Sequence, residues 1–172
     1  REIPLVLFGP YTEILNSAYT DFDWPEHWWF TTLISLIRRK RLEPWSDFYA
    51  LGEISEEDVM PIVGNAYALI MPSLSEGGGS YPVEEALSMG VPVLCSDIPV
   101  LREHLSKRSA DVLWFDPESP DSIVMALNSL VKNYDHYKHS AMNSMADPRP
   151  TWDDVADAYV KLFKKVVGSR KL

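Results

Sequence analysis

The chain has 172 residues, the size of one domain, and its 46% apolar and 24% charged residues are typical of a globular protein with a proper core. A formal net charge of −9 argues against nucleic acid or anionic lipid as a main partner, because both require a cationic surface. The single cysteine, Cys95, excludes an internal disulfide and a zinc site of several thiolates, and a reducing compartment fits this usage.

No apolar run approaches the roughly 20 residues that span a bilayer, and no signal peptide opens the chain. We therefore expect a cytoplasmic protein. The first residue is Arg1 rather than Met, from which we expect a fragment of a longer protein. The composition predicts one domain over residues 1–172, with a sheet and its covering helices in 1–150 and a closing helix in 151–172.

Short apolar runs alternate with amphipathic segments in the first half of the chain. Residues 3–8 predict a strand buried on both faces, because the run is continuously apolar and Gly9-Pro10 closes it. The segment 11–26 has no clear periodicity and predicts a loop or a broken helix. The next expected elements are a helix, a strand and a helix: 27–42, 48–51 and 54–65. Ser55 and Asp58 predict a capping box at the last of these.

The second half continues the alternation. Its expected strands are 67–71, 91–95 and 111–115, and its expected helices are 82–89, 100–105, 121–133, 135–145 and 152–167. Strands that alternate with helices predict a parallel sheet covered on both faces, in a Rossmann-like, doubly wound arrangement. In such α/β sheets a ligand binds outside the carboxyl ends of the strands, where the strand order reverses.

The glycine loop (residues 76–80, Glu-Gly-Gly-Gly-Ser) lies between the strand 67–71 and the helix that begins near Pro82. Free N–H groups at a helix start carry the positive end of the helix dipole, so a phosphate placed there meets several donors. Flanking carboxylates can accept sugar hydroxyls. The alternatives are a flexible turn for the glycines and solvated helix-start acids for the glutamates.

A longer pattern surrounds this loop. Pro72-Ser73, the glycine loop, and Pro82-Val83-Glu84-Glu85-Ala86 with the following Gly90-Val91-Pro92-Val93 resemble the donor-binding signature of family 4 glycosyltransferases, which have the GT-B fold. Weaker matches flank it from Gly52 to Asp58 and at Leu101-Arg102-Glu103, Phe115-Asp116-Pro117 and Trp152. The resemblance extends over most of the chain and implies the C-terminal half of a GT-B enzyme.

The resemblance implies roles for particular residues. Glu76 matches the acid that faces the donor sugar, and we assign it the catalytic position. Glu85 matches the acid that grips the ribose of the nucleotide. Backbone amides of the glycine loop would cradle the distal phosphate, and the main chain around Gly52 to Ile54 would lie against the base. The donor-binding residues are therefore Gly52, Ile54, Glu76, Gly77, Gly78, Gly79, Ser80 and Glu85.

One departure from the family pattern concerns the spacing of the two acids. The family has seven residues between them, whereas eight lie between Glu76 and Glu85. Glu84 restores the spacing of seven but loses the alignment to Pro82 and Ala86, so it is the alternate ribose ligand. Successive helical residues are turned by ~100°, so both acids cannot face one ligand.

A second departure is that the family's basic pair for the donor pyrophosphate would lie upstream of the strand at 3–8. The acceptor-binding half would also precede that strand. The resemblance thus implies the donor-binding half of a retaining hexosyltransferase of polysaccharide biosynthesis, with the fragment inactive alone. The donor diphosphate would assist catalysis and no metal or other cofactor is expected.

The expected partners are a nucleotide sugar and the protein's own acceptor domain, with no nucleic acid. A glycan or glycolipid is the expected acceptor, and a peripheral contact with the inner face of a membrane through the N-terminal half is an option. The alternative function is a catalytically silent GT-B-like interaction or regulatory module. A nucleotide-sugar epimerase on the same fold requires a different arrangement of acids.

Several other residues have a structural interpretation beside a functional one. Arg102 lies near a strand end and either assists phosphate or forms a salt bridge. His104, His136 and His139 show no partner pattern for catalysis or metal binding. His136 and His139, at i and i+3 on a helix, could chelate a metal, but no third ligand is visible and we favour a surface face for them. The aromatic residues Trp24, Trp28, Trp29 and Phe30 either touch a lipid-linked acceptor or, as we favour, pack in the protein.

Overall fold

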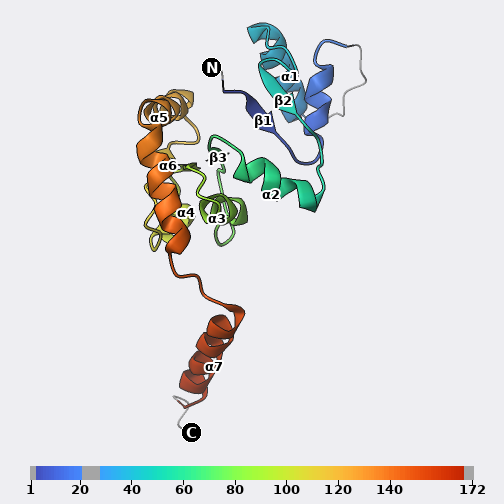
Figure 1. Ribbon diagram of the computed structural model, residues 1–172. Helices are drawn as coiled ribbons and strands as arrows, with labels where there is room; N and C mark the ends of the chain where they lie inside the picture. Colours follow the sequence, from blue (N-terminus) through green and yellow to red (C-terminus); the bar gives the residue numbers. More distant parts are fainter. Residues whose placement is uncertain (1–2, 21–27, 169–172) are drawn as a thin grey trace. The chain divides into compact units, whose positions relative to one another are not determined.

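The computed structural model describes residues 3–20 and 28–168 (Figure 1). The predicted aromatic contact at Trp24 therefore lies outside the described residues. The chain divides into two compact units, Arg1–Leu69 and Ile70–Leu172, which are described separately below. The predicted α/β class is confirmed, because parallel strands alternate with helices along the chain.

The first unit contains a two-stranded parallel sheet in which β1 (Leu5–Leu7) pairs with β2 (Phe48–Ala50), Leu5 opposite Phe48. Helix α1 (Trp28–Lys40) presents Phe30, Ile34 and Ile37 to the interior, at the spacing that places residues on one helix face. The other elements are the 3₁₀ helix η1 (Thr12–Ser17) and helix α2 (Glu56–Gly64). The buried cluster of this unit comprises Leu15, Ala18, Ile34, Ile37, Phe48 and Ala50.

Two expectations for the first unit are wrong. Strand β1 is not buried on both faces, since Leu5 and Val6 are 47% and 41% exposed and β2 is its neighbour in a two-stranded sheet. The capping box is not formed either. Ser55 is the N-cap of α2, but its hydroxyl donates to the carboxylate of Asp58 at 2.6 Å rather than accepting a backbone N–H.

The second unit is built on a three-stranded sheet of order β3 (Leu69–Met71), β4 (Val93–Ser96) and β5 (Leu113–Phe115). Strands β4 and β5 are parallel, with Leu94 opposite Leu113. All four residues of β4 are buried, as its continuous apolar run predicts. Helix α3 (Tyr81–Ser88) packs against β4. The remaining elements are α4 (Pro99–Leu105), α5 (Pro120–Lys132), α6 (Tyr134–Asn143) and η2 (Ser144–Ala146).

Helix α7 (Trp152–Gly168) forms as its periodicity predicts. None of its residues is buried, and the side chains of Tyr159, Leu162 and Phe163 are between 52% and 60% exposed. The expectation that this helix closes the domain stays a prediction. Among the described residues, no helix is both long enough and apolar enough to pass through a bilayer.

Candidate donor site at the glycine loop

The glycine loop leaves the sheet at the end of β3. Met71 ends that strand, and the hydroxyl of buried Ser96, at the end of β4, donates to its carbonyl at 3.2 Å. The Ser73 hydroxyl donates to Oε1 of Glu76 at 2.7 Å. This bond orients the half-buried Glu76 carboxylate at the beginning of the loop. Its second oxygen accepts no hydrogen bond from the described residues.

The amides of the glycine loop are unused. The backbone N–H groups of Gly78, Gly79 and Ser80 donate to no acceptor among the described residues. Ser80, the N-cap of α3, is only 3% exposed, yet its hydroxyl neither caps the helix nor finds another partner. Buried polar groups are normally satisfied, so free donors at a helix start are suited to an anionic ligand.

Gly79 is the position in the loop that requires glycine. Its φ is +125°, and a Cβ built there would lie 2.4 Å from Nδ1 of His104. At Gly77 and Gly78, by contrast, an added Cβ meets no atom within 4 Å. The imidazole of His104 therefore lies directly against the backbone at Gly79 and limits where the loop can run.

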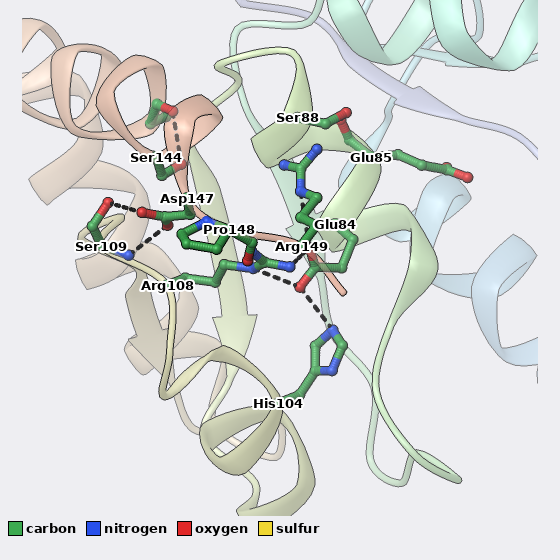
Figure 2. A network of polar contacts seen from close by, with 11 residues as sticks. Glu84, Glu85, Ser88, His104, Arg108, Ser109, Ser144, Asp147, Pro148 and Arg149 are labelled. Carbon is green, nitrogen blue, oxygen red and sulfur yellow. Dashed lines mark hydrogen bonds and ion pairs between the residues drawn. The ribbon is translucent and has the colours of Figure 1, made fainter. Parts of the chain in front are cut away.

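Glu84 is surrounded by the side chains of two arginines and a histidine (Figure 2). Arg108 binds its carboxylate with two nitrogens, Nη2 to Oε2 at 2.6 Å and Nε to Oε1 at 3.0 Å. His104 Nε2 lies 3.1 Å from Oε1 in an ion-pair contact without aligned hydrogen-bond geometry, and Arg149 Nε lies 3.9 Å from Oε2. Glu84 and Arg108 are 19% and 12% exposed, so solvent screens this pair less than a surface pair.

Glu85 has a different environment. Figure 2 shows its side chain directed away from the side chains that surround Glu84. The residue is half-buried, and its carboxylate forms no hydrogen bond or ion pair with any described residue. The Ser88 hydroxyl bonds the backbone carbonyl of Glu85, at 2.6 Å, and leaves the carboxylate unused. Of the two candidate acids, Glu85 is therefore the one available to a ligand.

Gly52 and Ile54 belong to the first unit, where Gly52 follows β2 with a φ of +77°. Its carbonyl accepts from the N–H of Gly9 at 2.8 Å, and its own N–H donates to the Thr12 hydroxyl at 3.0 Å. A Cβ at Gly52 would lie 2.9 Å from a carboxylate oxygen of Glu13, which the sequence analysis did not single out. The expectation that Gly52 and Ile54 contact the base stays a prediction.

Of the two roles considered for Arg102, phosphate binding and a salt bridge, the structure shows the salt bridge. Its guanidinium donates to both oxygens of Asp97, at 2.7 and 2.8 Å, and stacks 4.0 Å from the centre of the Trp114 ring. The hydrogen bond from Arg102 is the main cause that lowers the pKa of Asp97. Arg102 and Trp114 border an open hollow of about 550 Å³ that none of the predicted site residues lines.

Sequence reasoning missed His104 and Arg108 as neighbours of the loop. They come from α4 and the turn after it, 20 or more residues beyond Glu84, and no short motif relates them. The one feature of the sequence that could have indicated them is the group of basic residues and a histidine that follows the strand at 91–95. Among residues 3–20 and 28–168, no three His, Cys, Asp or Glu side chains are grouped to hold a metal ion.

Comparison with known proteins gives a family match. The family model described as "Glycosyl transferases group 1" matches residues 31–146. The O-antigen chain mannosyltransferase RfbU of Salmonella typhimurium is 35% identical over 80 residues, 46% of this chain and 22% of that protein. The chain spans only 22 to 29% of the length of the first curated relatives that it matches.

Solved structures share the fold. The C-terminal domain of a glycosyl transferase group 1 family protein (LpcC) from Francisella tularensis matches with a TM-score of 0.56 and 16% identity, over 91% of this chain and 88% of that chain. HepE from Anabaena, solved in complex with UDP, matches with a TM-score of 0.63 and 15% identity, over 84% of this chain and 35% of that one. The matched structures are glycosyltransferases with the predicted GT-B fold.

Proposed function

Because the chain belongs to the glycosyl transferases of group 1, we propose that it is the donor-binding half of a retaining glycosyltransferase. It binds a nucleoside diphosphate sugar at the glycine loop, and the sugar passes to a glycan or glycolipid acceptor held by another part of the protein. The observation that carries the proposal is the set of unbonded amides at Gly78, Gly79 and Ser80, placed between Glu76 and the unpaired Glu85.

The names of similar proteins support the same substrate class. RfbU is an O-antigen chain mannosyltransferase, and HepE was solved with UDP and also with UDP and glucose. The complexes of HepE are consistent with a nucleotide sugar as donor, and the name of RfbU is consistent with a polysaccharide as product. The name of RfbU also favours a transferase over an epimerase, which would act on the nucleotide sugar without an acceptor.

In the proposed reaction the bond between the anomeric carbon and the donor phosphate breaks, and the acceptor oxygen forms a new bond to that carbon on the same face. The departing diphosphate carries away the bonding electrons, and its freed oxygen takes up the proton of the acceptor hydroxyl. Amides at the start of α3 stabilise this developing charge, because preorganised donors cost little reorganisation when the bond breaks. Glu76 lies at the sugar end of the site and Glu85 bonds the ribose hydroxyls.

We propose that the diphosphate binds without a metal ion, because backbone amides of the glycine loop provide its donors. The affinity of the full-length protein for UDP, GDP or ADP should then be the same with and without EDTA. Isothermal titration calorimetry measures this directly. A large loss of affinity in EDTA that returns on adding Mg²⁺ or Mn²⁺ would contradict metal-free binding.

Titration of the full-length protein with UDP, GDP and ADP, alone and as sugar conjugates, tests the proposed function. We expect one base to bind preferentially and Glu85→Ala to weaken binding by about tenfold or more, since a hydrogen bond to a charged group contributes roughly 1.5–3 kcal/mol. Equal affinity in wild type and Glu85→Ala contradicts the ribose assignment. Release of nucleotide from the sugar conjugate, with or without acceptor, separates a transferase from a catalytically silent module, which binds without turnover.

A further inference from the structure

The first turn of α3 lacks the usual N-cap hydrogen bond and is held instead by the contacts of Glu84. Its N-cap, Ser80, makes no side-chain hydrogen bond to the helix, and the amides that lead into it bond to none of the residues that the structure describes. An N-cap bond typically contributes ~1 kcal/mol to a helix, and α3 is only eight residues long. The polar contacts of Glu84 tie this turn to other segments, and the ion pair with Arg108 is the one formed by two hydrogen bonds.

This ion pair limits the rotation of α3. Two parallel hydrogen bonds between a carboxylate and a guanidinium fix direction as well as distance. Buried Val83, Ala86 and Leu87 hold another face of the helix against the interior. Glu85 lies ~100° around the helix from Glu84. When the contacts of Glu84 hold α3 in place, the Glu85 side chain therefore points away from the Glu84 cluster, as Figure 2 shows.

The His104 side chain of this cluster also reaches the glycine loop. His104 contacts the Glu84 carboxylate through Nε2, while its opposite ring edge lies against the backbone at Gly79. The loop amides and the first turn of α3 are therefore held against one side chain of α4. A shift of Glu84 relative to His104 would change the spacing between the proposed phosphate donors and the proposed ribose acceptor.

We propose that Glu84 is a positioning residue for the donor, and that Arg108 and His104 act through it. Their contacts set the rotation of α3 so that Glu85 bonds the ribose diol of the nucleotide while the loop amides bond its diphosphate. The proposal rests on the proposed function, because it assumes that a nucleoside diphosphate occupies the loop. It assigns the two adjacent acids different tasks: Glu85 touches the ligand and Glu84 does not.

The test compares two probes on the full-length protein. One is the nucleoside diphosphate among UDP, GDP and ADP that binds most tightly, and the other is its 2′,3′-dideoxy counterpart, which lacks the ribose hydroxyls. The ratio of their affinities reports the contact between Glu85 and the ribose. Calorimetry gives this ratio for wild type, Glu84→Gln, Arg108→Gln and Glu85→Gln, and for Glu85→Gln combined with each of the other two. Glu103→Gln, an exposed acid on α4, is the matched control.

We expect Glu85→Gln to lower the affinity ratio by about tenfold. Glu84→Gln and Arg108→Gln should each lower it by several-fold, with weaker effects on the dideoxy probe. In combination with Glu85→Gln they should lower the ratio no further, because they act through the same contact. Glu103→Gln should leave it unchanged. Thermal unfolding by circular dichroism identifies a variant that fails to fold. Arg108→Lys, which keeps the charge without the two-nitrogen contact, then replaces Arg108→Gln.

Three results would overturn the proposal. If Glu84→Gln brings the affinity ratio to one, so that the ribose hydroxyls no longer matter, and Glu85→Gln does not, Glu84 itself binds the ribose. If Glu85→Gln brings the affinity ratio to one while Glu84→Gln and Arg108→Gln leave it at the wild-type value, the contacts of Glu84 serve stability alone. The proposed function then stands. If wild type binds none of the three diphosphates, the proposed function fails and the positioning role fails with it.

Discussion

Gly79 occupies the most constrained position in the glycine loop. Its φ of +125° and its contact with His104 both exclude a side chain. We expect Gly79→Ala to lower the stability of the protein by roughly 1–3 kcal/mol, the usual cost of such a backbone conformation in a non-glycine residue. Thermal or urea unfolding measures the change.

Gly77→Ala is the matched control for the stability measurement, because an added Cβ there meets nothing within 4 Å. It should unfold at nearly the wild-type temperature. Equal unfolding temperatures for Gly79→Ala and Gly77→Ala would show that the His104 ring moves aside at little cost, and would contradict the tight packing at Gly79.

Cys95 should be unreactive in the folded protein. Its side chain is fully buried in β4, and burial raises the pKa of its thiol from 9.0 to about 12. Labelling with a thiol reagent at pH 8 should therefore proceed only through unfolding and accelerate sharply in denaturant, since the thiolate is the reactive form. Rapid labelling under native conditions would contradict the burial of β4.

The same thiol affects stability at alkaline pH. The folded state keeps the proton of Cys95 up to about pH 12, whereas the unfolded state releases it near pH 9.0. The free energy of unfolding should thus be unaffected by this group below pH 9 and should fall as the pH rises from 9 toward 12. Cys95→Ala removes this contribution, so the variant should show a shallower alkaline decline than wild type.

At the scale of single residues, the sequence indicates the two acids and the glycine loop because they form a compact local pattern. It does not indicate which of Glu84 and Glu85 is available. That depends on Arg108 and Arg149, which lie 24 and 65 positions along the chain from Glu84. The contact of His104 with Gly79 was likewise not predictable, because it results from the packing of α4 on the loop.

At the scale of elements, the segment that leads to α7, at Asp147 and Pro148, is hydrogen-bonded to the turn after α4, at Arg108 and Ser109. The Asp147 carboxylate accepts from the backbone N–H and the hydroxyl of Ser109, at 2.8 and 2.7 Å. Arg108 donates to the carbonyl of Pro148 at 3.3 Å, so the side chain that binds Glu84 also holds this segment. The approach to α7 is therefore connected to the cluster beside the glycine loop.

We expect Asp147→Asn to loosen this attachment, because the bonds from Ser109 lose their charged acceptor. Limited proteolysis should then cleave residues 146–151 faster than in wild type. Asp153→Asn, an acid in the first turn of α7, is the control and should leave the cleavage rate unchanged. No acceleration in Asp147→Asn would mean that the segment is held by other contacts.

The attachment also has a predictable pH dependence. Bonds from the backbone and side chain of Ser109 lower the pKa of Asp147 from its usual 3.8. Their contribution is present above pH 3.8 and is lost as the pH falls through the lowered pKa. Cleavage of residues 146–151 by an acid-stable protease should accelerate at this low pH in wild type and much less in Asp147→Asn. Equal acceleration in both proteins would contradict a role for this carboxylate.

Hydrophobic periodicity predicts the helices and strands well, because amphipathic helices and buried strands have distinct repeats. Helix α5 begins and ends within one residue of its expected range, whereas strand β4 begins two residues later than expected and ends one residue later. For β1 the structure differs from the expectation in burial, not in the type of element. Strand β1 and helix α7 form as predicted but expose apolar residues, since a repeat does not specify what covers the apolar side.

At the scale of the whole molecule, family membership and fold have independent support from the sequence match and the matched structures. The single-domain organisation over residues 1–172 stays a prediction, as do the acceptor half and a peripheral membrane contact. Because the chain spans less than a third of its curated relatives, transfer to an acceptor is a property to be measured on the full-length protein.

Hydrogen exchange of the full-length protein, with and without saturating UDP, GDP or ADP, tests the central claim most directly. The account predicts that the bound nucleotide slows exchange at the amides of Gly78, Gly79 and Ser80 and in the first turn of α3, because these donors gain an acceptor. Binding that leaves these amides unchanged and protects another region, such as the hollow beside Trp114, would contradict a donor site at the glycine loop.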